Sequence, residues 1–127
     1  MMPGMQGKSR IEQGRVAEQL AAEFLARQGL RPIERNYRCR CGEIDLIMQD
    51  REGLVFVEVR FRRHTRFGGA AASVDRSKQQ KLLRAAQHYL QRKNAFNRPC
   101  RFDVVAVTPG RDGAPEFEWI RNAFELD

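Results

Sequence analysis

The stretch of sequence that decides the fold reads EIDLIM at residues 43–48 and LVFVEVRF at residues 54–61. Both runs are rich in β-branched and apolar side chains, which favour strands. The residues between them, Asp50-Arg51-Glu52-Gly53, are typical of a turn. The two runs therefore predict an antiparallel β-hairpin.

Two acidic side chains interrupt these apolar strands. Because side chains alternate between faces, Glu58 and Arg60 share one face of their strand with Phe56. A turn centred between residues 51 and 52 places Asp45 roughly opposite Glu58, with a cross-strand Cβ spacing of ~5 Å. Facing carboxylates repel unless a cation neutralises them, and oxygen ligands suit Mg²⁺ or Mn²⁺. The pattern predicts a metal site at Asp45 and Glu58; a structural ion-pair network with Arg60 is the alternative.

The rest of the chain surrounds this hairpin with helices and further strands. Apolar periodicity predicts helices over 10–28 and 75–93, and strand patterns cover 32–38, 101–107 and 117–120. A helix between the third and fourth strands allows a parallel crossover. We expect an α/β fold, with a mixed sheet in the order αβββαβ and an extra C-terminal strand. Residues 10–127 are expected to form a single domain after a flexible tail at 1–9.

The charge balance is strongly basic, with 23 Lys and Arg against 16 Asp and Glu and a net charge of +7. Such a surface attracts polyanions, and nucleic-acid binders carry this footprint. A basic loop at 62–73 continues directly from the strand that carries Glu58. Its residues Arg62, Arg63 and Arg66 are candidate phosphate contacts; a solvated basic loop is the alternative.

The 3 cysteines do not form a disulfide framework, because their number is odd and no secretory signal precedes them. The C-x-C spacing of Cys39 and Cys41 lacks the second pair that a zinc site needs. No apolar run approaches the ~18 residues of a membrane span. We therefore expect a cytoplasmic protein with reduced thiols and no membrane contact.

Asp45, followed after 12 residues by Glu58-Val59-Arg60, resembles the PD-(D/E)XK nuclease pattern. The blocks GEIDLI at 42–47, FVEVRFR at 56–62 and RFDVV at 101–105 resemble those of the YraN-type bacterial family, which is similar to archaeal Holliday junction resolvases. This resemblance covers the chain from about Gly14 to Val107. It implies a restriction-endonuclease-like core.

The resemblance also implies roles for single residues. Asp45 and Glu58 match the metal-binding carboxylates, and Glu18 matches an acidic residue beside the metal. Lys78 falls where the family has a basic residue at the start of its second helix. Arg60 departs from the pattern, since it replaces the motif's lysine. Arginine stays protonated and prefers bidentate contacts, so Arg60 either holds a scissile phosphate or locks Glu58 in a salt bridge and inactivates the site.

We therefore expect a metal-dependent endonuclease that hydrolyses phosphodiester bonds of DNA at branched or junction structures, with Asp45, Glu58, Arg60 and Glu18 as catalytic residues. Arg62, Arg63, Arg66 and Lys78 are its expected nucleic-acid contacts, and DNA is favoured over RNA. Resolvases of this fold act as dimers, which implies a homodimer. A non-catalytic nucleic-acid-binding module on the same scaffold is the alternative, and an adaptor that docks an acidic protein is a weaker one.

Overall fold

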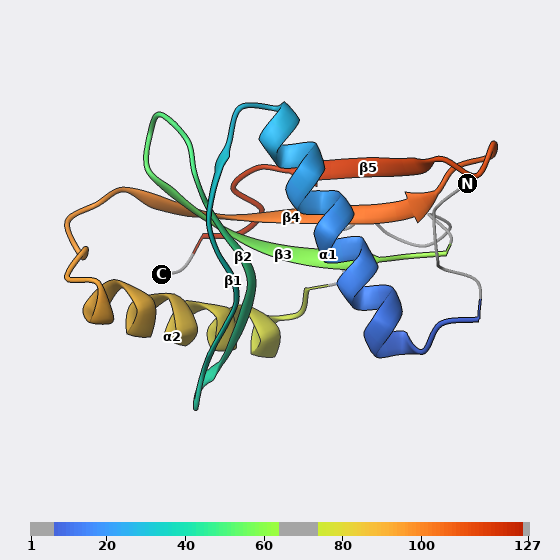
Figure 1. The fold of residues 1–127 in the computed structure, drawn as a ribbon. Coiled ribbons are helices and arrows are strands. Elements are labelled where there is room, and N and C mark those ends of the chain that lie inside the picture. The colour runs from blue at the N-terminus through green and yellow to red at the C-terminus, as the bar shows by residue number, and fades with distance from the viewer. Residues whose placement is uncertain (1–6, 64–73, 126–127) are drawn as a thin grey trace.

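The computed structural model describes residues 7–63 and 74–125. In chain order the elements are α1 (Arg10–Arg27), β1 (Arg31–Cys39), β2 (Gly42–Gln49), β3 (Leu54–Phe61), α2 (Arg76–Arg92), β4 (Cys100–Pro109) and β5 (Pro115–Ile120), as Figure 1 shows. Each helix and strand that the sequence predicts is present, with ends within a few residues of the expected ones. Most of the expected N-terminal tail and of the basic loop lies outside the described residues.

The strands form one 5-stranded sheet in the order β1-β2-β3-β4-β5. Neighbouring strands are antiparallel except β3 and β4, which run parallel. The connection between these parallel strands contains α2, as a crossover requires. The α/β class and the mixed sheet with an additional C-terminal strand are thereby confirmed.

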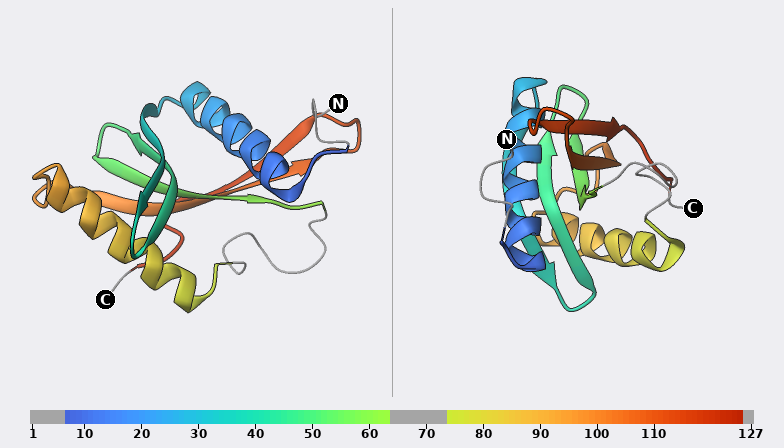
Figure 2. Two further views of the ribbon diagram at one scale, coloured as in Figure 1. Left: turned by 60° about the horizontal axis from the view of Figure 1, so that its bottom comes forward. Right: turned by 90° about the vertical axis from the view of Figure 1, so that its right-hand side faces the viewer.

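The two helices pack on opposite faces of the sheet, as the views in Figures 1 and 2 show. The valines of β3 point to the α1 side and Phe56 points to the α2 side, which confirms the alternation expected from the sequence. On the α1 side the core contains Ala17, Ala21, Leu25, Val55, Val57 and Val105; on the α2 side it contains Tyr37, Ile44, Phe56, Leu82, Ala85 and Tyr89. Burial of these two apolar layers is the main favourable contribution to folding.

Local signals define the helix ends. Ser9 and Glu12 form a capping box at the start of α1, and Asp75 caps α2 by accepting the backbone N–H of Lys78 at 2.8 Å. The turn between β1 and β2 lies against α2 at Gly42, where an added Cβ would approach the Lys81 carbonyl oxygen to 3.2 Å. Neither helix in the described part of the chain is long and apolar enough to span a membrane.

Candidate active site

The β2–β3 hairpin has the register that the turn predicts, but its ladder stops short of the acidic residues. The paired residues run from Gln49 with Leu54 to Leu46 with Val57. Beyond Val57, β3 continues to Phe61 in register with β4. The backbone N–H of Val59 donates instead to the Asp45 side chain, with 2.8 Å between nitrogen and Oδ2. Asp45 thus joins the two strands where their backbone pairing ends, rather than sitting as a ladder partner of Glu58.

A distortion of β1 and β2 coincides with this point. The register of the two strands pairs Arg35 with Leu46 and Tyr37 with Ile44, so Asn36 lies across from Asp45. Asn36 has a φ of 53°, in the left-handed region that non-glycine residues seldom adopt. Side-chain alternation also breaks here, since Ile44 and Ile47 pack on the α2 side and Leu46 packs on the α1 side. Strained backbone of this kind concentrates at functional sites.

Glu58 is the most buried of the predicted site residues that the structure describes, with only 4% of its side chain exposed. Two cations meet one of its oxygens: Arg60 Nη2 lies 3.2 Å from Oε2, and Lys78 Nζ lies 3.6 Å from the same atom. The other oxygen, Oε1, is buried and has no hydrogen-bond partner. Burial and the neighbouring Asp45 charge raise the pKa of Glu58 to about 8, although Lys78 and Arg60 oppose the rise.

Glu18, on α1, adds a third carboxylate to Asp45 and Glu58, and it interacts electrostatically with Asp45. Burial, followed by the charge of Asp45, raises the pKa of Glu18 to about 7, and a hydrogen bond from the Asn36 side chain counteracts the rise. Glu18 Oε1 is also buried without a hydrogen-bond partner. Asp45 therefore interacts with one carboxylate on each side, from α1 and from β3.

The donor set fits a hard divalent cation. All its atoms are carboxylate oxygens, the type of ligand that Mg²⁺ and Mn²⁺ prefer. The unpartnered oxygens of Glu18 and Glu58 and their raised pKa values both indicate that the surrounding protein groups do not fully stabilise the ionised carboxylates. Among residues 7–63 and 74–125, however, no three Asp, Glu, His or Cys side chains already stand in the arrangement of a metal site.

The remaining basic candidates are distributed differently. Arg62 continues β3 and its backbone N–H donates to the Val107 carbonyl oxygen at 2.9 Å, and Arg63 is exposed. Arg66 lies outside the described residues. Lys78, expected as a nucleic-acid contact, lies at Glu58 and thus within the carboxylate cluster.

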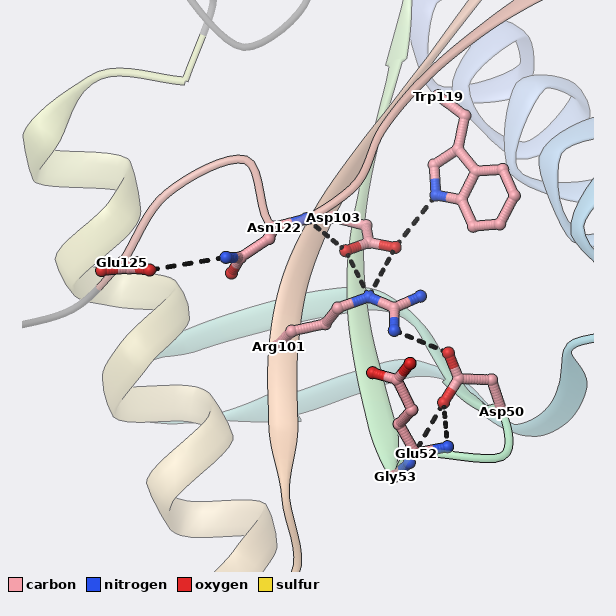
Figure 3. Close-up of polar contacts among 8 residues, drawn as sticks. All are labelled: Asp50, Glu52, Gly53, Arg101, Asp103, Trp119, Asn122 and Glu125. Carbon is pink, nitrogen blue, oxygen red and sulfur yellow. Dashed lines mark hydrogen bonds and ion pairs between the residues drawn. The ribbon is translucent and has the colours of Figure 1, made fainter.

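A second acidic side chain in the middle of the sheet, Asp103, has a contrasting environment (Figure 3). Its two oxygens accept from Arg101 Nε at 3.0 Å, Trp119 Nε1 at 2.9 Å and the Asn122 backbone at 2.9 Å. Arg101 extends the network to Asp50, with 2.6 Å between Nη1 and Oδ2. Both oxygens of Asp103 are thus satisfied, as expected of a structural carboxylate, whereas Glu58 and Glu18 each keep an unsatisfied oxygen.

A pocket of about 750 Å³ lies next to the Asp103 network. Its lining includes Arg101, Phe102, Arg121 and Phe124. Of the predicted site residues within 7–63 and 74–125, none lines this pocket. The candidate site is therefore assigned from the chemistry of its side chains and not from this hollow.

The sequence analysis predicted neither the left-handed conformation of Asn36 nor the contact of Lys78 with Glu58. The signal for Asn36 was available, because asparagine is among the few non-glycine residues that adopt the left-handed conformation. No periodicity within α2 indicates that its first turn reaches β3.

Fold and site together define a mixed α/β protein whose αβββαβ core brings carboxylates from α1, β2 and β3 together. The model of the family described as Uncharacterised protein family UPF0102 matches residues 17–107. A UPF0102 protein of Nitrosococcus oceani is 53% identical over 97% of this chain and 99% of its own length. A second, from Saccharophagus degradans, is 58% identical over 91% of this chain and 95% of its own. The chain belongs to the UPF0102 family, which confirms the expected YraN type.

Among solved structures, SfsA of Pyrococcus furiosus in complex with Ca²⁺ matches 91% of this chain and 65% of that chain. The identity is 13% and the TM-score is 0.39.

Proposed function

We propose that this protein is a metal-dependent endonuclease that hydrolyses phosphodiester bonds of DNA. One observation carries the proposal: Glu18, Asp45 and Glu58 come from three elements, and Asp45 raises the pKa of both glutamates. A cluster of carboxylates with buried, unpartnered oxygens is unfavourable unless a cation is bound. Such clusters occur where function requires them.

The residues divide into two groups. Asp45 and Glu58, with Glu18 beside them, would hold Mg²⁺ or Mn²⁺. A bound ion of this kind supplies a water of lowered pKa and positive charge close to the phosphate. Arg60 presents a fork of N–H donors that suits a phosphate, and it is only partly buried, with 32% of its side chain exposed. Arg62 and Arg63, which follow β3, and Arg66 further along the sequence add positive charge for contacts with a DNA backbone.

The test uses purified protein with Mg²⁺ or Mn²⁺ and four labelled substrates: duplex DNA, a four-way junction, a flap and RNA. We expect nicking of DNA, with branched substrates preferred over duplex. Asp45→Asn and Glu58→Gln should each lower the rate by at least about 1000-fold, because each removes a metal-binding charge while keeping the side-chain shape. The exposed β5 residue Glu118 provides a matched control, and Glu118→Gln should cleave at the rate of the native protein.

Metal binding is measured separately by titration calorimetry with Mn²⁺. One ion should bind to the native protein and to Glu118→Gln, and binding should weaken strongly in Asp45→Asn. If neither ion supports cleavage of any of the substrates, the catalytic proposal is wrong.

The ion pair between Arg60 and Glu58 favours a second candidate, a nucleic-acid-binding module without catalysis. In that case the guanidinium takes the place of a metal ion at Oε2. Binding to DNA should then survive Asp45→Asn. Neutralising Arg62, Arg63 and Arg66 together should weaken binding and lower the slope of log affinity against log salt by about 3, since each lost phosphate contact contributes about one unit. An unchanged affinity and slope in that triple variant would argue against this module.

The proposed partner is DNA rather than RNA, and the proposed assembly is a homodimer. Cleavage of the two symmetric strands of a junction calls for two sites related by a two-fold axis. Light scattering at the concentrations used for cleavage measures the mass directly. A monomer that still cuts both strands of a junction would contradict the dimer.

A further inference from the structure

Lys78 occupies a position that its role as a general DNA contact does not explain. Its Nζ lies 3.6 Å from Glu58 Oε2, the oxygen that also binds Arg60. The side chain reaches this oxygen from α2, and 33% of it remains exposed. The ammonium group therefore lies at the most buried carboxylate of the candidate site and keeps access to solvent.

Local helix energetics do not favour a cation at this position. Lys78 is the third residue of α2, in the first turn, and no acidic residue is present in that turn. The start of a helix carries partial positive charge, so a cation there is unfavourable by about 0.3–1 kcal/mol. In α1 the equivalent position holds Glu12, which completes a capping box. The contact with Glu58 in β3, and not the helix itself, accounts for a lysine here.

The surrounding structure holds this turn of α2 in place. The Lys78 backbone N–H donates to the Asp75 side chain at 2.8 Å, and Gln79 Nε2 donates to the Val74 carbonyl oxygen at 3.0 Å. Val74 and Leu82 are buried in the core on the α2 side. The base of the Lys78 side chain is thus fixed, and its long stem carries the charge to Glu58.

Lysine and arginine perform different chemistry at such a site. Arginine is a planar fork that suits the two oxygens of a phosphate, whereas the ammonium of lysine is a compact charge with three rotatable donors. An ammonium group can turn one of its N–H donors toward a water molecule while another remains paired with a carboxylate. Arg60 therefore suits phosphate binding and Lys78 suits water binding. Relative to the PD-(D/E)XK pattern, the lysine comes from α2 and an arginine stands at the motif's lysine position.

We propose that Lys78 replaces the motif's lysine in this protein by holding the attacking water beside Glu58, while Arg60 binds the scissile phosphate. The inference rests on the proposed nuclease function. In the reaction the water oxygen forms a bond to phosphorus as the bond from phosphorus to one sugar oxygen breaks. The water loses one proton to solvent, and the departing oxygen gains one from solvent.

The experiment compares Lys78→Gln with Lys81→Gln, which removes an exposed lysine one turn later in α2. Glutamine is a favourable residue at the third position of a helix, so Lys78→Gln should fold normally. We expect Lys78→Gln to lower kcat by about 100-fold or more, the usual effect of removing one positioned donor. KM for DNA should change by less than about 3-fold, and the affinity for Mn²⁺ should not fall, because Lys78 contacts Glu58 and holds neither the DNA nor the ion. Lys81→Gln should retain the native kcat.

Rescue tests the exchange of positions. Arg60→Lys keeps a positive charge near the scissile phosphate, so adding it to Lys78→Gln returns an ammonium group to the site from β3, and kcat should recover by at least about 10-fold. A merely structural role for Lys78 predicts no recovery, and loss of Mn²⁺ binding in Lys78→Gln would equally overturn the inference. A native kcat in Lys78→Gln would overturn it while leaving the nuclease function intact, whereas a native protein that cleaves nothing overturns both.

Discussion

Replacement of a candidate metal-binding residue, Glu58→Gln, is predicted to stabilise the metal-free protein. Burial and the Asp45 charge raise the pKa of Glu58 from 4.5 to about 8. At pH 7 the carboxyl of Glu58 is mostly protonated in the folded protein. In the unfolded chain it is ionised, because pH 7 lies about 2.5 units above its unfolded pKa of 4.5. Each pKa unit corresponds to about 1.4 kcal/mol, so ionisation favours the unfolded chain by on the order of 3 kcal/mol. Glutamine is neutral in both states and removes this difference.

The sign of the pH dependence follows from the direction of the shift. Because the folded protein binds the proton more tightly than the unfolded chain, the stability from this group is fully present below pH 4.5. It is lost as the pH rises toward 8. The gain from Glu58→Gln should therefore be near zero at pH 4.5, on the order of 3 kcal/mol at pH 7, and larger again at pH 8.

Urea denaturation in the presence of a chelator measures this difference at each pH. At neutral pH the Tm should also rise, by about 10 °C. The control Glu118→Gln, exposed on β5, should stay within about 0.5 kcal/mol of the native protein at every pH. If Glu58→Gln lowers the stability at pH 7, or if the difference does not vary with pH, then the ion pairs with Arg60 and Lys78 outweigh the burial of Glu58 and the reasoning is refuted.

Three further predictions concern the scaffold. Asp103→Asn should destabilise the protein by about 3 kcal/mol in urea denaturation, because the amide cannot accept from all the donors around it, Trp119 among them; a loss below 1 kcal/mol would contradict this. Gly53→Ala should lower the Tm markedly, since the new Cβ would lie 2.2 Å from the Pro99 carbonyl oxygen, and a native Tm would show that the β3 start moves freely. Ser9→Ala should cost about 1 kcal/mol through loss of the α1 cap, and an unchanged urea midpoint would argue against the capping box.

The elements most accurately predicted from the sequence are those whose signals are local. The hairpin register followed from its turn, and the faces of β3 followed from strict alternation, because both depend on residues a few positions apart. The same reasoning placed Asp45 roughly opposite Glu58. In the structure the β2–β3 pairing ends at Leu46 and Val57, and the Asp45 side chain accepts a hydrogen bond from the Val59 backbone N–H. The alternation of side chains along a strand does not reveal where the pairing between two strands ends.

The sequence by itself determined the order of helices and strands, the two apolar faces of the sheet, and Asp45 and Glu58 as candidate site residues. Each of these depends on the spacing of residues within one element or one hairpin. Only the tertiary structure decided that the charge of Asp45 acts on the Glu18 carboxyl and that Lys78 pairs with Glu58. The physical reason is the parallel crossover from β3 to β4. It carries α2 across one face of the sheet while α1 covers the other, and the position of a helix on a twisted sheet depends on packing between elements.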